Sequence, residues 1–131
     1  MRVVIVHPDS KLADQTQQVI HQIWHRSLTD AIQLPAEHRQ VLDYFSQIAP
    51  PWPDLVMVSL AFLERHPDIL AAIQRHPGYG FFRLVVLVRG SDQHGRAALL
   101  GSDHEIVHEP VSPMSLRQGM AFSLPHGLAA V

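Results

Sequence analysis

Pro53-Asp54-Leu55-Val56-Met57-Val58-Ser59 is continuously apolar from Leu55 to Val58, with one acidic residue at its entrance and a small hydroxyl residue at its end. A run of this length with β-branched members is typical of a strand that is buried on both faces, as in parallel sheets. Similar runs occur at Val3–Val6 and Leu84–Val88. The sequence therefore indicates a sheet that is covered by helices on both sides.

The segments between these strands have the apolar spacing of amphipathic helices. The first predicts a helix from Lys11 to about His25, with Asp9 or Ser10 as its N-cap. Leu60 to His66 is expected to be a loop. Further helices are expected from Pro35 to about Ile48, from Pro67 to the break at His76, around Ala97–Leu100, and from near Ser112 or Met114; short strands are expected at Asp30–Leu34 and Ile106–His108.

Strands and helices alternate along the chain, which requires right-handed crossovers and helices on both faces of the sheet. Five strands predict an α/β fold with a doubly wound parallel sheet in the order 2-1-3-4-5, a flavodoxin-like sandwich of three layers. We expect one domain over residues 1–124 and a tail over 125–131. The functional crevice should lie at the carboxyl ends of strands 1 and 3, where the strand order reverses.

Composition narrows the classes of function. The 131 residues are 47% apolar, and 10 basic and 12 acidic residues nearly balance. The arginines are scattered from Arg2 to Arg117, so no direct nucleic-acid binding by this domain is expected. Cysteine is absent, which excludes disulfides and thiol chemistry. No signal peptide or membrane span is recognisable, and we expect a cytoplasmic protein.

Signals for catalysis, metals and cofactors are weak. His21 and His25 are four residues apart, as are His104 and His108, but no HExxH motif accompanies them. Ser59 lacks the Gly-x-Ser-x-Gly elbow of a serine nucleophile. The turn His7-Pro8-Asp9-Ser10 lacks the glycines of a dinucleotide or phosphate loop. We therefore expect no enzyme, no metal site and no cofactor.

Taken together, these elements resemble the receiver domain of bacterial two-component response regulators over nearly the whole chain. The resemblance is carried by Val3–Val6 before a polar turn, by residues 53–58 before the acceptor position, by Val85–Val88 before a small-residue loop, and by Glu109-Pro110-Val111-Ser112-Pro113 after Gly101. It implies a signalling domain. It also implies that the Glu109–Pro110 peptide bond is cis, as the corresponding bond of the family often is.

The resemblance also implies which positions would form a phosphorylation site. That family has an acidic pair after strand 1, an acceptor aspartate after strand 3, a hydroxyl residue after strand 4, and a lysine before a proline after strand 5. These positions fall on His7 and Pro8 (or Pro8 and Asp9), on Ser59, on Val88 with Arg89 next, and on Glu109 before Pro110. The shifted match leaves one acid, Asp9, and Pro110 is kept, but in the first match none of the five working positions keeps the family residue. The resemblance is therefore to a degenerate receiver, or pseudo-receiver.

The chemistry of the substituted residues agrees with this interpretation. Mg²⁺ prefers several hard oxygen ligands, and an acyl phosphate cannot form on Ser59. Glu109 would repel a phosphoryl group where lysine should attract it. Each unit-charge pair at ~4 Å and a dielectric of ~20 contributes about 4 kcal/mol, so the reversal amounts to about 8 kcal/mol. We expect no phosphorylation switch.

Three functions remain open at this stage. The first is a pseudo-receiver that acts through protein contacts in signal transduction or transcriptional regulation, with a kinase, an output domain or a second copy as its partner. By the resemblance, its contact face combines the fourth helix, fifth strand and fifth helix, at Ala97, Leu100, Val107, Val111, Met114 and Phe122.

The second is a flavodoxin-like domain that binds a small ligand or nucleotide in a pocket lined by Asp9, Ser59 and Arg89. The third is an enzyme that uses Ser59 and His7, which would need to lie within about 2.6–3.2 Å of each other. The weak final helix and apolar tail also fit a longer regulator that continues beyond Val131.

Overall fold

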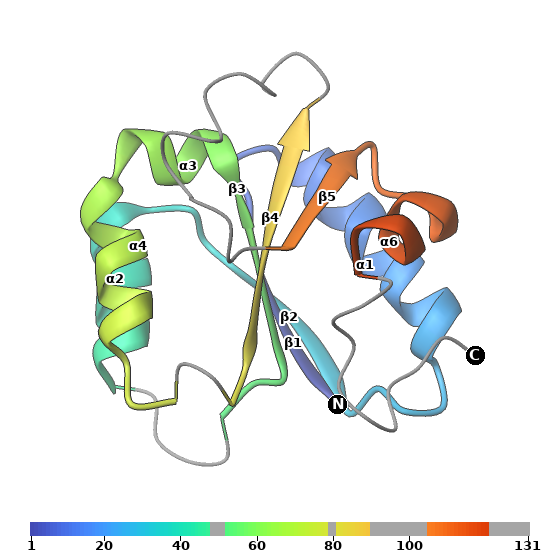
Figure 1. Cartoon of the computed structure of the whole chain (residues 1–131), viewed down its shortest axis with the longest axis horizontal. Helices are drawn as coiled ribbons and strands as arrows, with labels where there is room; N and C mark the ends of the chain where they lie inside the picture. Colours follow the sequence, from blue (N-terminus) through green and yellow to red (C-terminus); the bar gives the residue numbers. More distant parts are fainter. Residues whose placement is uncertain (48–51, 79–80, 90–104, 121–131) are drawn as a thin grey trace.

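The computed structural model describes residues 1–47, 52–78, 81–89 and 105–120. Within them, a five-stranded parallel sheet has the order β2-β1-β3-β4-β5 (Figure 1). Its strands are β1 (Arg2–Val6), β2 (Asp30–Leu34), β3 (Leu55–Ser59), β4 (Arg83–Arg89) and β5 (Glu105–Glu109). The predicted strand order is confirmed, and the observed strands lie within one residue of the predicted ones at each end.

The described helices cover both faces of the sheet, as Figure 1 shows. Their bounds are α1 (Ser10–Trp24), α2 (His38–Gln47), α3 (Leu60–Arg65), α4 (Pro67–Arg75) and α6 (Pro113–Met120). Helices α1 and α6 lie on one face, and α2, α3 and α4 lie on the other. The three-layer α/β sandwich expected from the alternating pattern is therefore present.

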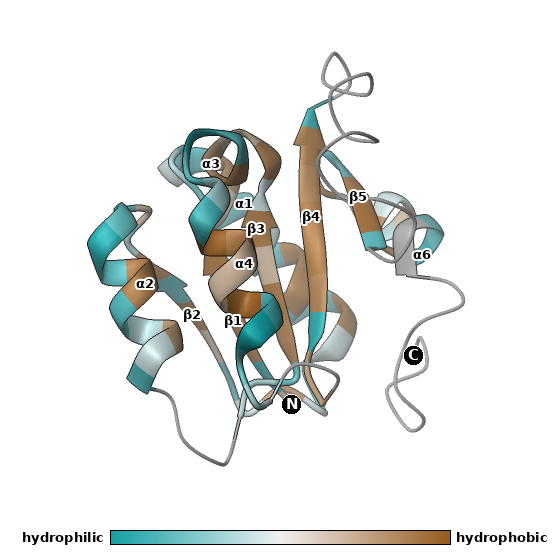
Figure 2. Cartoon of the chain, turned by 60° about the vertical axis from the view of Figure 1, so that its left-hand side comes forward, coloured by the Kyte–Doolittle hydropathy of each residue, from teal (hydrophilic) through white to brown (hydrophobic). Residues whose placement is uncertain are grey.

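The strands divide their side chains between two apolar clusters, one on each face. On β3, Leu55 and Met57 pack with α1 and α6, whereas Val56 and Val58 pack with α2, α3 and α4. All four are fully buried, which explains why the strand has no alternating polar positions. Full burial of each such side chain stabilises the fold by about 1.5–3 kcal/mol. Figure 2 shows the apolar β4 lying between helices that carry polar residues.

The segment after β3 differs from its prediction. Leu60–Arg65 forms helix α3, where a loop was expected. Leu60, Phe62 and Leu63 are buried against the sheet and α4, and this packing stabilises a six-residue helix that would be marginal alone. Pro67 then begins α4, as predicted.

The start of α2 also differs. The helix begins at His38, three residues after Pro35. The amide of Glu37 donates to the Pro35 carbonyl at 2.8 Å in a tight turn, and the first helical bond runs from Val41 to Glu37. The helix expected around Ala97–Leu100 and the tail 125–131 fall outside the described residues. No helix in the described ranges is long and apolar enough to cross a membrane.

Candidate functional site

The carboxyl ends of β1, β3, β4 and β5 surround a cavity of about 640 Å³. This is the edge at which the strand order reverses, where doubly wound sheets place their ligands. Six of the eight residues predicted for the degenerate phosphorylation cleft line it: His7, Pro8, Asp9, Ser59, Arg89 and Glu109. Val88 and Pro110 are not among the lining residues, and the sequence interpretation did not name Ser10, Ala61, Arg65 or Leu87, which are.

Strand register explains which side chains reach the cavity. Ser59 pairs with Leu87, and Arg89 pairs with Glu109. Because side chains alternate along a strand, Leu87 and Val88 point to opposite faces. Val88 is fully buried among the residues that pack against α2, α3 and α4. The residues of β4 at the cleft are therefore Leu87 and Arg89, and the placement of Val88 in the cleft was wrong.

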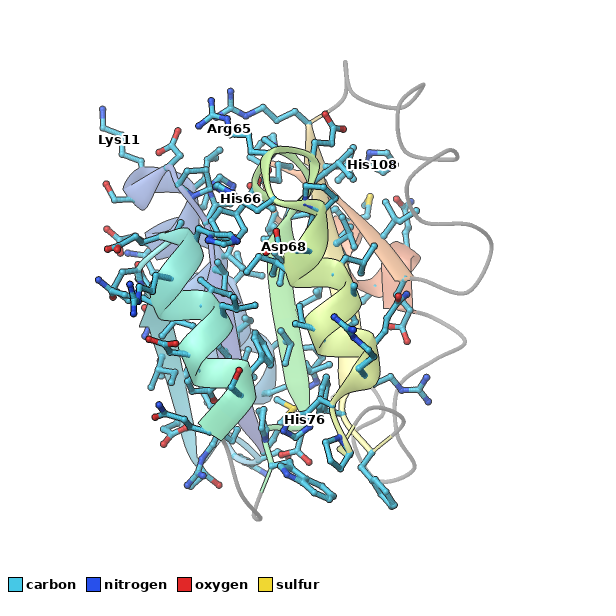
Figure 3. The ribbon with its side chains drawn as sticks, turned by 90° about the vertical axis from the view of Figure 1, so that its left-hand side faces the viewer. Lys11, Arg65, His66, Asp68, His76 and His108 are labelled. Atoms are coloured by element: carbon cyan, nitrogen blue, oxygen red, sulfur yellow. The ribbon has the colours of Figure 1, made fainter. Side chains whose placement is uncertain are left out.

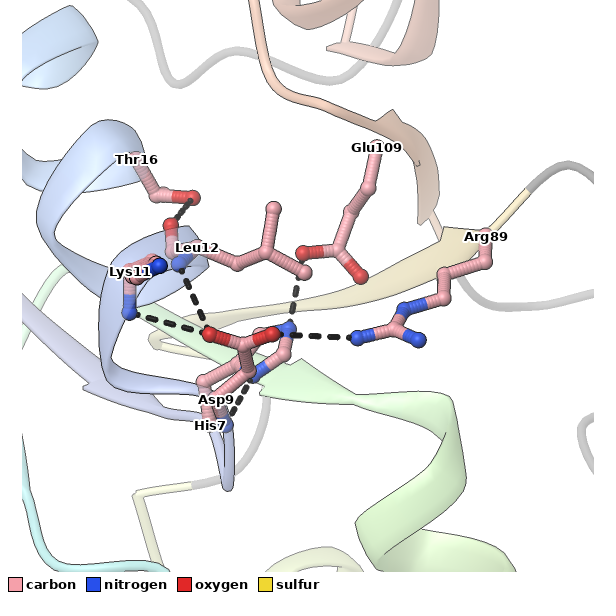
Figure 4. A network of polar contacts seen from close by, with 7 residues as sticks. All are labelled: His7, Asp9, Lys11, Leu12, Thr16, Arg89 and Glu109. Carbon is pink, nitrogen blue, oxygen red and sulfur yellow. Dashed lines mark hydrogen bonds and ion pairs between the residues drawn. The ribbon is translucent and has the colours of Figure 1, made fainter.

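His7 and Glu109 form a buried hydrogen-bonded pair across the cleft (Figure 4). His7 Nε2 lies 2.7 Å from Glu109 Oε2, and the two side chains are only 2% and 3% exposed. The other ring nitrogen, Nδ1, accepts from the Asp9 amide at 2.9 Å. Because Nδ1 is an acceptor, this geometry assigns the ring proton to Nε2, which donates it to the carboxylate. His7 thus satisfies a carboxylate that would otherwise be buried without a donor.

Asp9 connects the same network to α1 and β4. Its Oδ1 accepts from the amides of Lys11 at 3.0 Å and Leu12 at 3.4 Å, which makes Asp9 the N-cap of α1. Its Oδ2 lies 3.2 Å from Nη2 of Arg89. Both carboxylate oxygens therefore already have protein donors. No group of three or more His, Cys, Asp or Glu side chains among the described residues is arranged to hold a metal ion.

Ser59 is the N-cap residue of α3, but its hydroxyl makes no capping hydrogen bond. The residue is 3% exposed, and no hydrogen bond joins its hydroxyl to another described residue. Both ring nitrogens of His7 are occupied by Glu109 and the Asp9 amide. His7 is therefore not arranged as a general base for Ser59, which the enzyme hypothesis required.

Comparison with known proteins defines the fold. No protein-family model matches the chain, and no curated protein does either. Among solved structures, the chain is similar to a bacteriophytochrome response regulator, with a TM-score of 0.68 and 15% sequence identity over 92% of this chain and 89% of that one. The chain has a receiver fold.

Two consequences of the receiver fold were visible in the sequence. The Glu109–Pro110 peptide bond is cis, as the resemblance implied. Of the residues that the resemblance assigned to the cleft, all but Val88 and Pro110 line the cavity, and their role as a degenerate phosphorylation site stays a prediction. Sequence reasoning missed Arg65, because the segment that carries it was expected to be a loop. It also missed the pairing of His7 with Glu109, although both residues directly follow strands that were predicted to end at the same edge.

The contact face expected from the resemblance stays a prediction, and two of its six residues do not fit it. Val107 and Val111 are buried in the cluster that packs against α1, so their side chains cannot contact a partner. This corrects the expectation, and the reason is again strand alternation, which turns Val107 toward the helix layer. Met114 is 68% exposed and remains available. Ala97, Leu100 and Phe122 lie outside the described residues, as does His104.

Proposed function

We propose that this chain is a receiver-like signalling domain that works without phosphorylation, through contacts with other proteins. Support comes from the receiver fold, combined with a cleft whose residues lack the chemistry of phosphoryl transfer. Ser59 occupies the acceptor position at the end of β3, and a serine cannot form an acyl phosphate. Asp9, an acid that lines the same cleft, is engaged by the α1 amides and by Arg89.

The observation that carries the proposal is the buried His7–Glu109 pair. In the receiver pattern, the position after strand 1 is acidic and the position after strand 5 is a lysine. Here a histidine follows strand 1 and a glutamate follows strand 5, and a hydrogen bond joins their side chains across the cleft. The acid and the lysine of the receiver pattern are therefore both replaced at these positions. Removing the histidine leaves the buried carboxylate without its donor, at a cost of about 2–3 kcal/mol, so the pair is a structural part of the cleft.

Intact-mass measurement after incubation with acetyl phosphate and Mg²⁺ tests the proposal. We expect no phosphoryl adduct on the wild-type chain. Ser59→Asp is the informative variant, because it restores an acceptor carboxylate but leaves His7 and Glu109 in place. We expect it to remain unmodified as well, since no metal site is found among the described residues and Glu109 stands where the receiver pattern has its lysine. A stoichiometric adduct on the wild-type chain would refute the proposal.

The proposal includes the setting and the partner. The response regulators that the chain resembles act in the bacterial cytoplasm, and we place this chain there. Its partner is a kinase, an output domain or a second copy of the chain, and the exposed Met114 at the start of α6 is the described residue best placed to contact it. Light scattering at high concentration tests the second-copy case, which a monomer contradicts.

A further inference from the structure

The cleft contains a hydroxyl that no described residue engages in a hydrogen bond. Ser59 is 3% exposed and lines the cavity of about 640 Å³. Among the described residues, no donor or acceptor pairs with its Oγ atom. Ser59 Oγ is not among the buried side-chain atoms that lack a partner, so the hydroxyl opens onto the cavity, where a polar ligand atom can pair with it.

Two arginines from different elements border the same cavity. Arg65 comes from the last turn of α3, and Arg89 comes from the end of β4. Figure 3 shows Arg65 at the same end of the molecule as Lys11, with His76 at the opposite end. Within the described part of the chain, Arg65 has no ion-pair partner, whereas Arg89 is paired with Asp9. The guanidinium of Arg65 is therefore a free cation at the rim.

The two acids that line the cavity, Asp9 and Glu109, both accept hydrogen bonds from other residues of the protein. Asp9 receives hydrogen bonds from the amides of Lys11 and Leu12 and from Arg89. Glu109 is hydrogen-bonded to His7 and nearly inaccessible. Both carboxylates thus have donors from the protein. Among the described lining residues, the donors left over include the Arg65 guanidinium and the hydroxyls of Ser59 and Ser10, which suit an anion.

We propose that the cleft binds a small anion, a carboxylate or phosphate group, without a metal ion and without a covalent bond. Arg65 offers the planar pair of N–H donors that matches two anionic oxygens, and Ser59 donates from the cavity floor. Pro8, Ala61 and Leu87 supply an apolar wall for the rest of a small ligand. The inference rests on the proposed function, because it assigns a use to a cleft that has no phosphoryl chemistry.

Titration by NMR in EDTA, at constant ionic strength set with sodium chloride, tests the inference with two probes. One arm uses inorganic phosphate and the other uses acetate. We expect saturable shifts of the amides of Ser59 and Ala61 with at least one probe. Binding by phosphate alone assigns the site to phosphate groups, binding by acetate alone assigns it to carboxylates, and either result supports the proposal.

Matched variants separate a built site from a general charge effect. Loss of a hydrogen-bonding charged group should weaken binding about tenfold or more in Arg65→Ala, and Ser59→Ala should weaken it several-fold. Arg75→Ala is the control, because Arg75 is an exposed arginine in the last turn of α4, next to His76 at the other end of the molecule. We expect it to bind like the wild type.

Ser59→Ala has a second readout that does not depend on a ligand. Because the hydroxyl has no partner among the described residues, the variant should be at least as stable as the wild type in ligand-free urea denaturation. A well-folded Ser59→Ala chain with weakened binding is therefore the expected result.

Two outcomes overturn the inference: no saturable shift with either probe, or equal weakening by Arg65→Ala and Arg75→Ala. Neither probe is a phosphodonor, and EDTA removes Mg²⁺. Failure to bind therefore leaves the phosphodonor test untouched, while a phosphoryl adduct in that test would refute the proposed function whatever the binding result.

Discussion

His7 and Glu109 form a buried side-chain pair between two residues that are far apart in the sequence. The two positions are 102 residues apart in the chain, and their side chains meet at 2.7 Å in a nearly inaccessible place. Each has an unfavourable environment alone, because a buried carboxylate requires a donor and a buried imidazole requires partners for both nitrogens. Their pairing, together with the Asp9 amide, meets these requirements.

His7→Ala should therefore destabilise the chain. It leaves the Glu109 carboxylate buried without its donor, and we expect a loss of about 2–3 kcal/mol in the free energy of unfolding. Glu109→Gln should cost less, since its amide oxygen can still accept from Nε2. Urea denaturation measures both changes. An unchanged midpoint for His7→Ala would show that water replaces the imidazole without penalty.

At the scale of elements, helix ends and helix pairs depend on single polar contacts. The N-terminus of α1 is capped by Asp9, which also contacts Arg89 at the end of β4. Helices α2 and α4 are joined by His38 and Asp68, whose side chains are hydrogen-bonded. The His38 and His66 rings are also in contact, with centroids 4.8 Å apart and planes tilted by 38°. The Asp9–Arg89 and His38–Asp68 pairs are both exposed to solvent, so each contributes only modestly to the free energy of unfolding.

The two roles of Asp9 can be separated by substitution. Asp9→Ala loses the cap and should reduce the free energy of unfolding by about 1 kcal/mol, within a range of roughly 0.5–2. Asp9→Asn keeps a capping oxygen and loses only the exposed ion pair with Arg89, for which about 0–1 kcal/mol is expected. Urea denaturation of the two variants distinguishes these contributions. Equal losses would mean that the ion pair, not the cap, holds the start of α1.

The Asp68 contact makes a prediction about pH. The hydrogen bond from His38 holds the pKa of Asp68 below its ordinary value of 3.8. A carboxyl whose pKa is lowered on folding stabilises the folded state above its unfolded pKa and loses this effect as pH falls through the folded value. Asp68→Asn should thus be less stable than the wild type at neutral pH, and the difference should shrink below about pH 4. Thermal denaturation midpoints across this range test it, and a constant difference would contradict it.

For the stability of the whole molecule, the most important element is the central strand β3. The strand lies in the middle of the sheet and every one of its residues is buried. Its side chains contribute to both apolar clusters, one on each face of the sheet. A cavity in this strand cannot be filled by movement of a surface helix alone. Its side chains should therefore carry large shares of the stability.

A comparison of two methionines tests this. Met57 is fully buried in β3, whereas Met114 is 68% exposed at the start of α6. Met57→Ala should lower the free energy of unfolding by about 2–5 kcal/mol, and Met114→Ala should change it by no more than about 0.5 kcal/mol. Chemical denaturation of both variants measures the contrast. Similar small losses would mean that the core relaxes around the missing side chain.

Much of the architecture was readable from local patterns. Continuous apolar runs such as Leu55–Val58 predicted buried parallel strands, and Pro67 marked the start of α4. These signals are local because burial on both faces and the geometry of proline act on each segment separately. Segment Leu60–Arg65 was misread because a six-residue helix has too few turns to show a period, and its stability comes from packing.

The amino-acid order was thus sufficient for the strands and for their order in the sheet. The contacts between side chains from different elements could not be predicted from the sequence. Register and alternation placed Leu87 and Arg89 in the cleft and turned Val88 and Val107 into the core. The crossovers brought His7 to Glu109 and Asp9 to Arg89 over 102 and 80 residues, and no local pattern encodes contacts between such distant positions.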